Sequence, residues 1–308
     1  MSDPTMNVLQ EMFKVFSQLP LEAQELFEHN VYELMVKRNN SSYYSYSTFK
    51  RIFGLCSKYN IDHQYSSILE IGAGKPLGMG VFWNLSGAKK YTSIDRYVPA
   101  NLDKLWITRF RWILDMNLYH PDNFNIANLI RENGDNYLLN PDKIEMIQEN
   151  FADYPFPPNS FDFIYSFAVL EHIADVTTIL NKMHQVLRDG GKMIHIIDLR
   201  EHHTNLRTVP NKDTSIDFLK YSQTEWESMY PPGSEHYINR LRASDFNQRC
   251  QKSGFEVIDF ITTQEMTIGD EIYDMIHDDF RKYPIDDLKV MGITIVLQKK
   301  SIQEALST

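Results

Sequence analysis

The fold is decided by the stretch Ser67-Ile-Leu-Glu-Ile-Gly72-Ala-Gly-Lys-Pro-Leu-Gly78. It begins with a short apolar run, Ser67 to Ile71, of the kind that forms a buried strand. The glycines after this run predict a sharp turn into a helix, because a residue without a side chain lets the backbone come close to a ligand. Ligands of open α/β sheets bind beyond the carboxyl ends of the strands, so the turn is a candidate binding loop. The alternative is a tight strand-to-helix turn that binds nothing.

Further apolar runs of strand length follow this one along the chain. They are Tyr91–Asp95, Ile144–Gln148, Phe161–Phe167, Lys192–Asp198, Phe255–Ile261 and Met291–Leu297. Segments long enough for helices separate most of them, and such alternation is typical of parallel strands with helices packed on the sheet. The sequence therefore predicts an α/β fold with a seven-stranded, mostly parallel sheet that carries helices on both faces.

The N-terminal residues differ from the rest because their apolar side chains repeat at helical spacing. The repeat runs through Leu9, Met12, Phe13 and Phe16, then Phe27, Val31, Leu34 and Met35, and then Tyr46, Phe49, Ile52, Phe53 and Cys56. We predict an N-terminal helical cap over residues 1–60 and a main domain over residues 61–300. Two connections, at about 98–143 and 199–239, are longer than the fold requires and are predicted to be insertions.

The composition disfavours several classes of protein. The chain has 308 residues and a formal net charge of −10, which opposes binding to nucleic acid phosphates or anionic lipid. No apolar run reaches the roughly 20 residues of a membrane span, and the N-terminus lacks a signal-peptide pattern. Cys56 and Cys250 stand apart, in no metal-binding or redox spacing. We expect a cytoplasmic protein that binds neither nucleic acid nor a membrane and holds no metal.

The spacing of the glycines separates two classes of cofactor. A dinucleotide-binding loop has the pattern G-x-G-x-x-G, whose third glycine would stand at Leu77. The chain instead has G-x-G-x-x-x-G, which ends at Gly78 and is preceded by Glu70. A second acid, Asp95, ends the next strand, where a carboxylate can accept hydrogen bonds from ribose hydroxyls. The pattern favours a nucleoside-bearing ligand that is not a nicotinamide dinucleotide.

These features resemble the class I S-adenosylmethionine-dependent methyltransferases, and the resemblance extends from about Ser66 to Leu297. The run Asn150–Asp162 resembles the D-A-E-D-L-P-F-P-D-N-S-F-D segment of the ubiquinone-type and related small-molecule methyltransferases (methyltransferase type 11). Two later runs, Tyr165–His172 and Leu187–Lys192, resemble the S-x-x-V-L-E-H and L-K-P-G-G segments of the same proteins.

The resemblance implies a Rossmann-like fold and S-adenosylmethionine as the cofactor. In the family, the acid that ends the second strand holds the ribose, and the residue at position 150 accepts a hydrogen bond from the adenine amino group. The implied cofactor-binding residues are Glu70, Gly72, Ala73, Gly74, Gly78, Asp95, Arg96, Asn150, Phe151, Ser166 and Phe167. The chain departs from the family at Pro76, Asn150 and Asp189, where glycine, aspartate and proline are usual.

The segment Asp198-Leu-Arg-Glu-His202-His203 carries the candidate catalytic residues. It follows the carboxyl end of a strand, on the side where a methyl acceptor must lie. A hydroxyl acceptor loses a proton, and the ordinary pKa of histidine suits that step near neutral pH. We predict that His202 or His203 is the general base and that Asp198 or Glu201 orients it. The alternative is a solvated polar loop, and His172 is expected to pack or cap.

Several functions remain open. Together with Phe218–Tyr221 and Asn239–Arg242, the histidine segment resembles a bacterial subgroup linked to surface-glycan or secondary-metabolite pathways. O-methylation of a sugar or secondary metabolite is preferred over N-methylation of an amine, because no carboxylate cage for an amine is apparent. A binding subunit without activity is disfavoured by the intact loop, ribose acid and polar cluster. A nicotinamide oxidoreductase is disfavoured by the glycine spacing.

Overall fold

The computed structural model describes residues 42–74, 78–96, 130–133, 136–202, 215–234 and 236–300. The chain divides into two compact units, residues 1–154 and residues 155–308, which we call the N-terminal unit and the C-terminal unit. The first two predicted cap helices, most of the first predicted insertion and His203 lie outside the described residues. Within those residues, no helix combines the length and apolarity needed to cross a bilayer.

The N-terminal unit contains three parallel strands in the order β5-β2-β1. They are β1 (Ser67–Ile71), β2 (Lys90–Asp95) and β5 (Ile144–Gln148). Glu70 pairs with Ser93 and Ile71 with Ile94, so that β1 and β2 end beside each other. All three strands lie where the apolar runs predicted them. The hairpin of β3 (Ile130–Asn133) and β4 (Asn136–Leu139) was not predicted.

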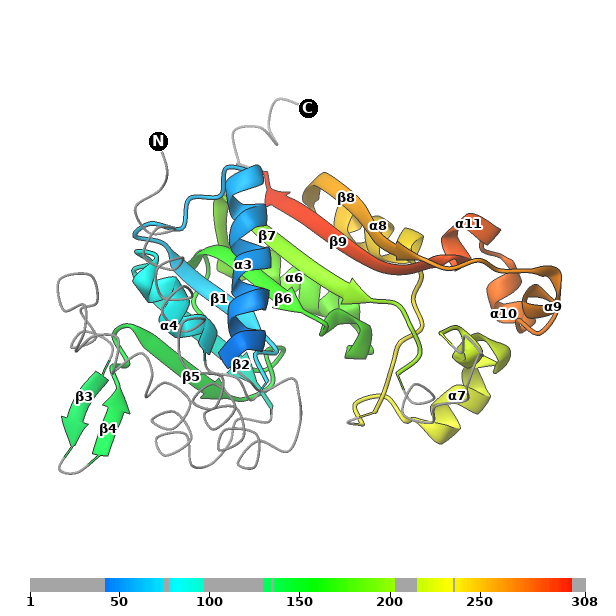
Figure 1. Cartoon of the computed structure of the whole chain (residues 1–308), viewed down its shortest axis with the longest axis horizontal. Coiled ribbons are helices and arrows are strands. Elements are labelled where there is room, and N and C mark those ends of the chain that lie inside the picture. The colour runs from blue at the N-terminus through cyan, green and yellow to red at the C-terminus, as the bar shows by residue number, and fades with distance from the viewer. Residues whose placement is uncertain are drawn as a thin grey trace, which may run out of the picture. The chain divides into compact units, whose positions relative to one another are not determined.

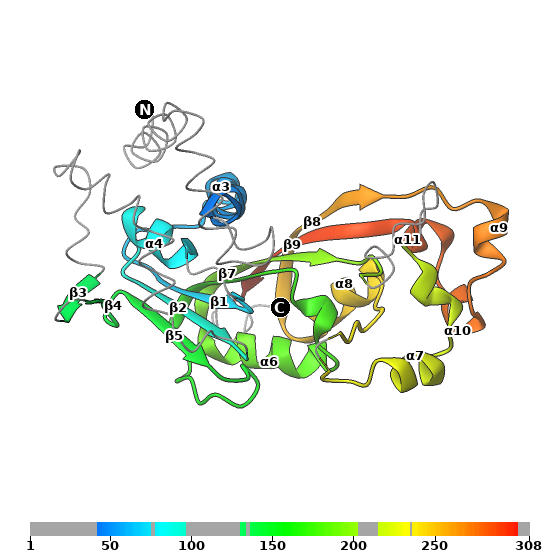
Figure 2. The same cartoon turned by 60° about the horizontal axis from the view of Figure 1, so that its bottom comes forward.

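Helix α3 (Ser42–Lys58) agrees with the third helical stretch predicted from the sequence. The residues that it buries recur at three- and four-residue steps: Phe49, Ile52, Phe53 and Cys56. Helix α4 (Gly78–Leu85) contributes Phe82 and Trp83, whose ring centroids lie 5.3 Å and 5.0 Å from that of Phe49. Figure 2 shows α3 and α4 on the same side of β1 and β2. This aromatic cluster anchors α3 to α4, the helix that begins after the glycine loop.

The C-terminal unit contains four strands in the order β6-β7-β9-β8. They are β6 (Phe161–Phe167), β7 (Leu187–Asp198), β9 (Val290–Lys299) and β8 (Phe255–Glu265). β6 and β7 are parallel, whereas β7 and β9, and β9 and β8, are antiparallel. Helices α6 (Val176–Val186) and α8 (Ala243–Lys252) cover one side of these strands in Figure 2.

A group of short helices gathers at the end of the C-terminal unit where β7 ends and β9 begins (Figure 1). They are η5 (Asp217–Lys220), α7 (Gln223–Met229), α9 (Asp270–Tyr273), α10 (Asp278–Arg281) and α11 (Ile285–Leu288). Their apolar residues form one buried cluster that includes Phe218, Trp226, Phe280 and Leu288. Because this cluster buries its own apolar surface, the helices form a small core at the carboxyl end of β7.

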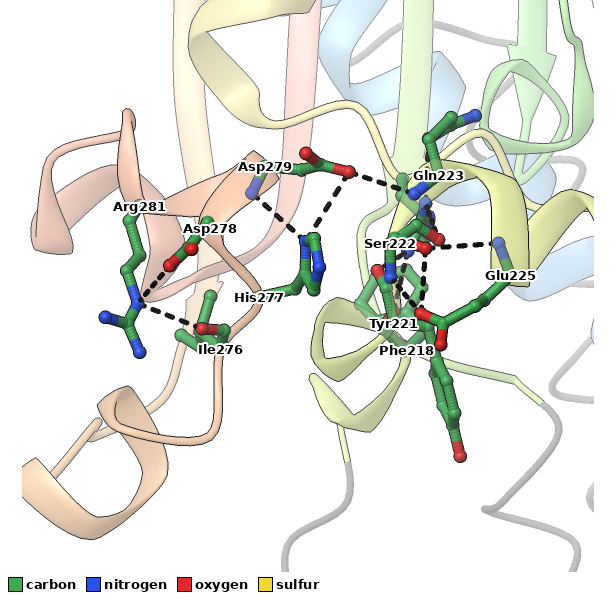
Figure 3. A network of polar contacts seen from close by, with 11 residues as sticks. Phe218, Tyr221, Ser222, Gln223, Glu225, Ile276, His277, Asp278, Asp279 and Arg281 are labelled. Atoms are coloured by element: carbon green, nitrogen blue, oxygen red, sulfur yellow. Dashed lines mark hydrogen bonds and ion pairs between the residues drawn. The ribbon is translucent and has the colours of Figure 1, made fainter.

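Polar contacts at the surface of this core join α7 to α10, as Figure 3 shows. The Asp279 carboxylate accepts a hydrogen bond from the Gln223 backbone N–H at 3.0 Å and lies 3.5 Å from His277 Nδ1. Helix α7 begins with a capping box, in which Ser222 and Glu225 satisfy each other's backbone N–H groups. These contacts fix the start of α7, since the first N–H groups of a helix have no partner within it.

Taken together, the strands follow the order β5-β2-β1-β6-β7-β9-β8 in a seven-stranded sheet. The predicted fold class, an α/β fold with a mostly parallel sheet and helices packed on it, is confirmed. β7, β8 and β9 extend beyond their apolar runs, because polar residues also take part in the ladders at their ends.

Candidate active site

The glycine loop follows β1 in the N-terminal unit, and its backbone conformation requires glycine. Gly72 has a φ of 72° and Gly74 a φ of 61°, in the left-handed region that side chains disfavour. The Gly72 N–H donates to the Ile94 carbonyl oxygen at 2.9 Å. The turn therefore presents backbone without side chains at both glycines, at the end of the two strands where a nucleoside ligand was predicted.

Asp95 ties the loop to the end of β2. Its Oδ2 accepts a hydrogen bond from the Gly74 N–H at 2.8 Å. The predicted ribose acid and the predicted glycine loop, which are far apart in the sequence, are thus joined directly. Arg96, the next residue, is exposed, and its carbonyl oxygen accepts a hydrogen bond from Gln148 Nε2 at 3.5 Å.

Glu70 lies inside the unit rather than at its surface. Its side chain is buried, and its Oε2 accepts a hydrogen bond from the hydroxyl of Tyr91, which is also buried. Tyr91 belongs to β2, so this contact joins β1 to β2 just before the glycine loop begins. The geometry gives Glu70 a part in holding the two strand ends together.

Asn150 starts a tight turn after β5. Its side-chain Oδ1 accepts a hydrogen bond from the Ala152 N–H at 3.3 Å, and its Nδ2 donates to Asp153 Oδ2 at 2.7 Å. Phe151, between them, is buried. The turn orients the Asn150 amide and places an exposed carboxylate, that of Asp153, beside it. Asp153 was not predicted as a site residue, although it stands within the motif that named Asn150.

Ser166 and Phe167 end β6 in the C-terminal unit. Ser166 Oγ lies 2.8 Å from Nδ1 of His195, its partner on β7, and both side chains are fully buried. Burial lowers the pKa of His195 to about 3, so its ring is neutral at physiological pH. The Ser166 hydroxyl is therefore occupied within the sheet, which leaves the backbone of Ser166 for the predicted cofactor role. Phe167 is half-buried.

A short 3₁₀ helix, η3 (Leu170–His172), follows β6 and places a buried acid beside the end of β7. Glu171 is 1% exposed, and its Oε1 accepts a hydrogen bond from the Asp198 N–H at 3.3 Å. Among the residues that the structure describes, its Oε2 has no hydrogen-bond partner. Burial raises the pKa of Glu171 to about 8, with a smaller contribution from the Asp198 charge. Glu171 is thus a neutral acid at pH 7, a role that the sequence motif around it did not reveal.

Asp198, at the end of β7, has the opposite character. Burial alone would raise its pKa, but hydrogen bonds from Arg200, together with the contact to His202, outweigh burial and lower the pKa well below its usual range. The Arg200 Nε donates to Asp198 Oδ1 at 2.8 Å, and a second guanidinium nitrogen donates to Oδ2 at 2.5 Å. This two-point contact keeps the carboxylate ionised and fixes its orientation.

The predicted base and its orienting acid lie together. Nε2 of His202 is 3.5 Å from Asp198 Oδ2, and the His202 side chain is 29% exposed. The ring of His172 lies beside that of His202, with centroids 5.2 Å apart. His172 Nδ1 is 2.8 Å from the Tyr237 carbonyl oxygen, which agrees with the expected capping role. Glu201 is buried, and its N–H donates to the Ser215 carbonyl oxygen at 2.8 Å.

Comparison with known proteins agrees with this geometry. Residues 48–259 match the family model of a methyltransferase domain. No curated protein matches the chain by sequence.

Solved structures with a similar chain trace come from several organisms. One, from Listeria monocytogenes and assigned as an S-adenosylmethionine-dependent methyltransferase, shares 15% identity with a TM-score of 0.47, over 81% of this chain and 98% of that one. A SAM-dependent methyltransferase from Methanosarcina mazei shares 18% identity with a TM-score of 0.44, over 80% and 97%. One from Mesorhizobium loti shares 13% identity with a TM-score of 0.41, over 76% and 91%.

The residues present fit an adenosyl cofactor. A turn with two left-handed glycines leaves backbone open to a ligand, and an acid bonded to that turn ends the neighbouring strand. The family model covers more than half of the chain and includes this turn, the acid and the whole of β6 and β7. The chain belongs to the S-adenosylmethionine-dependent methyltransferases of class I, and S-adenosylmethionine is its cofactor.

Proposed function

We propose that the chain methylates a hydroxyl group of a small molecule, such as a sugar or secondary metabolite, with a histidine general base. S-adenosylmethionine supplies an electrophilic methyl group and a neutral thioether leaving group, so the protein mainly has to position the acceptor and remove its proton. The observation that carries the proposal is the pairing of His202 with Asp198 at the carboxyl end of β7.

The pairing assigns a task to each ring nitrogen of His202. Nε2 faces the Asp198 carboxylate, so a hydrogen on Nε2 is stabilised there and Nδ1 carries the lone pair. Nδ1 is then the atom that takes the proton of the acceptor hydroxyl. Because Arg200 keeps Asp198 ionised, the carboxylate also stabilises the imidazolium that forms when the proton arrives. His203 is the other candidate base and lies outside the described residues.

The charges around this pair favour oxygen over nitrogen as the acceptor atom. An ammonium acceptor would be recognised by free carboxylates. The negative charge of Asp198 is already balanced by the positive charge of Arg200, and Glu171 is protonated at pH 7. N-methylation of a small amine remains the alternative and would require a carboxylate outside this group. The net charge of −10 also argues for a small acceptor rather than a nucleic acid.

The cofactor seat that we propose combines the loop, the ribose acid and the turn after β5. Asp95, which already accepts the Gly74 N–H, would also accept hydrogen bonds from the ribose hydroxyls, because a carboxylate offers about four acceptor sites. Asn150 would accept the hydrogen bond of the adenine amino group, beside the backbone of Phe151. The other residues that the family resemblance implies for this seat are Glu70, Gly72, Ala73, Gly78 and Arg96. For the C-terminal unit the resemblance implies Ser166 and Phe167 as cofactor-binding residues.

The function can be tested by a screen followed by substitution of the base. Purified protein is incubated with S-adenosylmethionine and a set of hydroxylated sugars and metabolites, with matched amines alongside, and release of S-adenosylhomocysteine is measured. We expect release with hydroxylated acceptors. Release with the amines alone would contradict O-methylation.

Once the screen has identified an acceptor, His202→Gln and the double variant His202→Gln/His203→Gln test whether these histidines act as the general base. A general base contributes about 10²- to 10⁴-fold, so turnover should fall by that amount in at least the double variant. His236→Gln, at an exposed histidine of the same unit, is the matched control and should keep the wild-type rate. A double variant within about threefold of wild type would exclude both histidines as the base.

A further inference from the structure

A six-residue segment outside helix and strand, Tyr237–Arg242, joins η3 and the end of β7 to the small helical core of the C-terminal unit. We call it the strap; it is the yellow segment between α7 and α8 in Figure 1. Its residues are buried, with the exception of Leu241, which is half-buried. The sequence singled out Asn239–Arg242 as a motif, and the function proposed above gives it no role.

One set of strap residues binds η3, the turn that carries His172. The Asn239 N–H donates to the Glu171 carbonyl oxygen at 2.8 Å. The Asn239 side-chain Nδ2 donates to the carbonyl oxygens of Leu170 at 2.7 Å and Ile173 at 2.9 Å. The strap therefore binds carbonyl groups in and directly after this short helix, which has too few turns to satisfy them itself.

The strap also fixes the hydrogen of the His172 ring. The Tyr237 carbonyl oxygen lies 2.8 Å from His172 Nδ1, and a carbonyl can only accept a hydrogen bond. Nδ1 must therefore carry the hydrogen, which leaves the lone pair on Nε2. A ring oriented in this way by a third group has the arrangement of an activated proton acceptor.

The other set of strap residues binds the end of β7 and the helical core. Arg242 is fully buried, and its guanidinium donates to the carbonyl oxygens of Leu199 at 3.2 Å, Leu288 at 3.1 Å and Val290 at 2.5 Å. Leu199 lies between Asp198 and Arg200. The strap thus forms hydrogen bonds with both segments that carry the site: η3 with His172, and the end of β7 with Asp198.

Arg240 completes the attachment of the strap to the helices. It donates to the carbonyl oxygens of Phe218 at 2.9 Å and Tyr221 at 2.7 Å, and its guanidinium lies 5.3 Å from the centre of the Trp226 ring. The carbonyl partners of both arginines match the planar, multiple donors of guanidinium, which lysine does not offer. Burial lowers the pKa of Arg240 and of Arg242 to about 10, so both remain charged at neutral pH.

We propose that the strap sets the separation of the His172 and His202 rings, and that Asn239 is its central positioning residue. The inference rests on the proposed function, in which His202 takes the acceptor proton; the His172 ring packs beside it, with centroids 5.2 Å apart. Asn239 is suited to the task because its side chain bonds at both ends: Nδ2 donates to two carbonyl groups, and Oδ1 accepts the Leu241 N–H at 3.0 Å. Its effect on catalysis passes through the His172 ring.

The first test follows the His172 ring itself and needs no acceptor. Long-range ¹H–¹⁵N spectra of the full chain report which ring nitrogen carries the hydrogen, and His172→Gln assigns the signal. We expect Nδ1–H in the wild type and a mixture of both forms in Asn239→Ala. Asn239→Asp has the size of asparagine but cannot donate to the two carbonyl groups, so it should also show a mixture of the two His172 tautomers. A wild-type His172 signal in both variants would overturn the inference.

The second test separates positioning from folding. We expect turnover of the acceptor found in the screen to fall about 10- to 100-fold in both Asn239 variants, because small displacements at a reacting centre have effects of this size. The KM for S-adenosylmethionine should change less than about threefold. Asn247→Ala, on helix α8, is the matched control and should keep the wild-type turnover.

The outcomes distinguish this inference from the proposed function. If His202→Gln/His203→Gln loses turnover while the Asn239 variants keep it, the result supports His202 or His203 as the general base, and the inference about the strap fails. If turnover, the affinity for S-adenosylmethionine and the melting temperature all fall in the Asn239 variants, the strap stabilises the fold without positioning the histidine rings, and the inference fails. If the Asn239 variants lose turnover and the histidine variants keep it, the proposed base fails, and the inference about the histidine pair fails with it.

Discussion

The edge of the N-terminal unit that carries the glycine loop and the edge of the C-terminal unit that carries the histidines are built in different ways. The first uses backbone: Gly72 and Gly74 take left-handed conformations, and the Gly74 N–H binds Asp95. The second uses side chains with opposed electrostatics, a neutral Glu171 beside an ionised Asp198. Backbone chemistry suits a ligand that is the same in every family member, whereas side-chain chemistry can be changed for each acceptor. The two edges should therefore respond differently to substitution.

The largest expected effect is on the backbone-built edge. Gly74→Val places a β-branched side chain at a φ of 61°, which strains the turn, weakens the contact to Asp95 and fills space beside the ligand. We expect the affinity for S-adenosylhomocysteine, measured by calorimetry, to fall about 100-fold or more, equivalent to about 2.7 kcal/mol. Gly54→Ala is the control, because an added Cβ there meets no atom within 4 Å. Equal affinities of the two variants would show that the loop does not hold the cofactor.

A smaller and pH-dependent effect is expected at Glu171, on the side-chain-built edge. The unfolded chain releases the Glu171 proton near the ordinary pKa of 4.5, while the folded chain holds it up to about pH 8. Raising the pH through this window therefore favours the unfolded state, by about 1.4 kcal/mol per pH unit. Glu171→Gln has no proton to release and should lack this loss.

The measurement is the free energy of unfolding in urea at pH 5 and at pH 7, for both proteins. The wild type should lose about 2–3 kcal/mol more than Glu171→Gln between the two pH values. If the free energy of unfolding changed with pH in the same way in both proteins, Glu171 would be ionised in the folded state. The contrast between a neutral Glu171 and an ionised Asp198 would then be wrong.

The smallest effect is expected away from both edges, at the start of α7. Ser222→Ala removes the N-cap of the capping box and should lower the free energy of unfolding by about 1 kcal/mol. Ser228→Ala, in the same helix, removes a hydroxyl that donates to the Glu225 carbonyl oxygen and caps no helix N–H; it should change the free energy of unfolding by less than about 0.5 kcal/mol. A Ser222→Ala variant with a weakened affinity for S-adenosylhomocysteine would break the assumption that the cofactor edge is independent of the helical core.

The same contrast explains how much could be predicted from the sequence. The strands β1, β5 and β6 begin and end at their apolar runs. For β1 and β6, which lie inside the sheet, the reason is burial, because a parallel strand covered on both faces needs apolar residues along most of its length. The glycine loop and Asp95 were found by spacing, since the backbone conformation of a turn is a local property. The β3–β4 hairpin was missed because its strands are only four residues long and carry no apolar alternation.

The side-chain-built edge could be predicted only in part. The pairing of Asp198 with His202 was expected from their proximity in the sequence. The neutrality of Glu171 and the carbonyl partners of Arg242 were not, because both result from burial by segments distant in the chain. Arginine residues are usually expected to be exposed. The fold shows that Arg240 and Arg242 are instead buried among backbone carbonyl groups.

The most direct test of the central claim is a calorimetric titration of S-adenosylhomocysteine into the wild-type chain and into Asp95→Ala. We expect one binding site per wild-type chain and an affinity about 10- to 100-fold weaker in the variant, the range for a lost charge-assisted hydrogen bond. Absence of binding to a folded wild-type chain, or equal affinity in the two proteins, would contradict the claim that the glycine turn and Asp95 together bind the adenosyl cofactor.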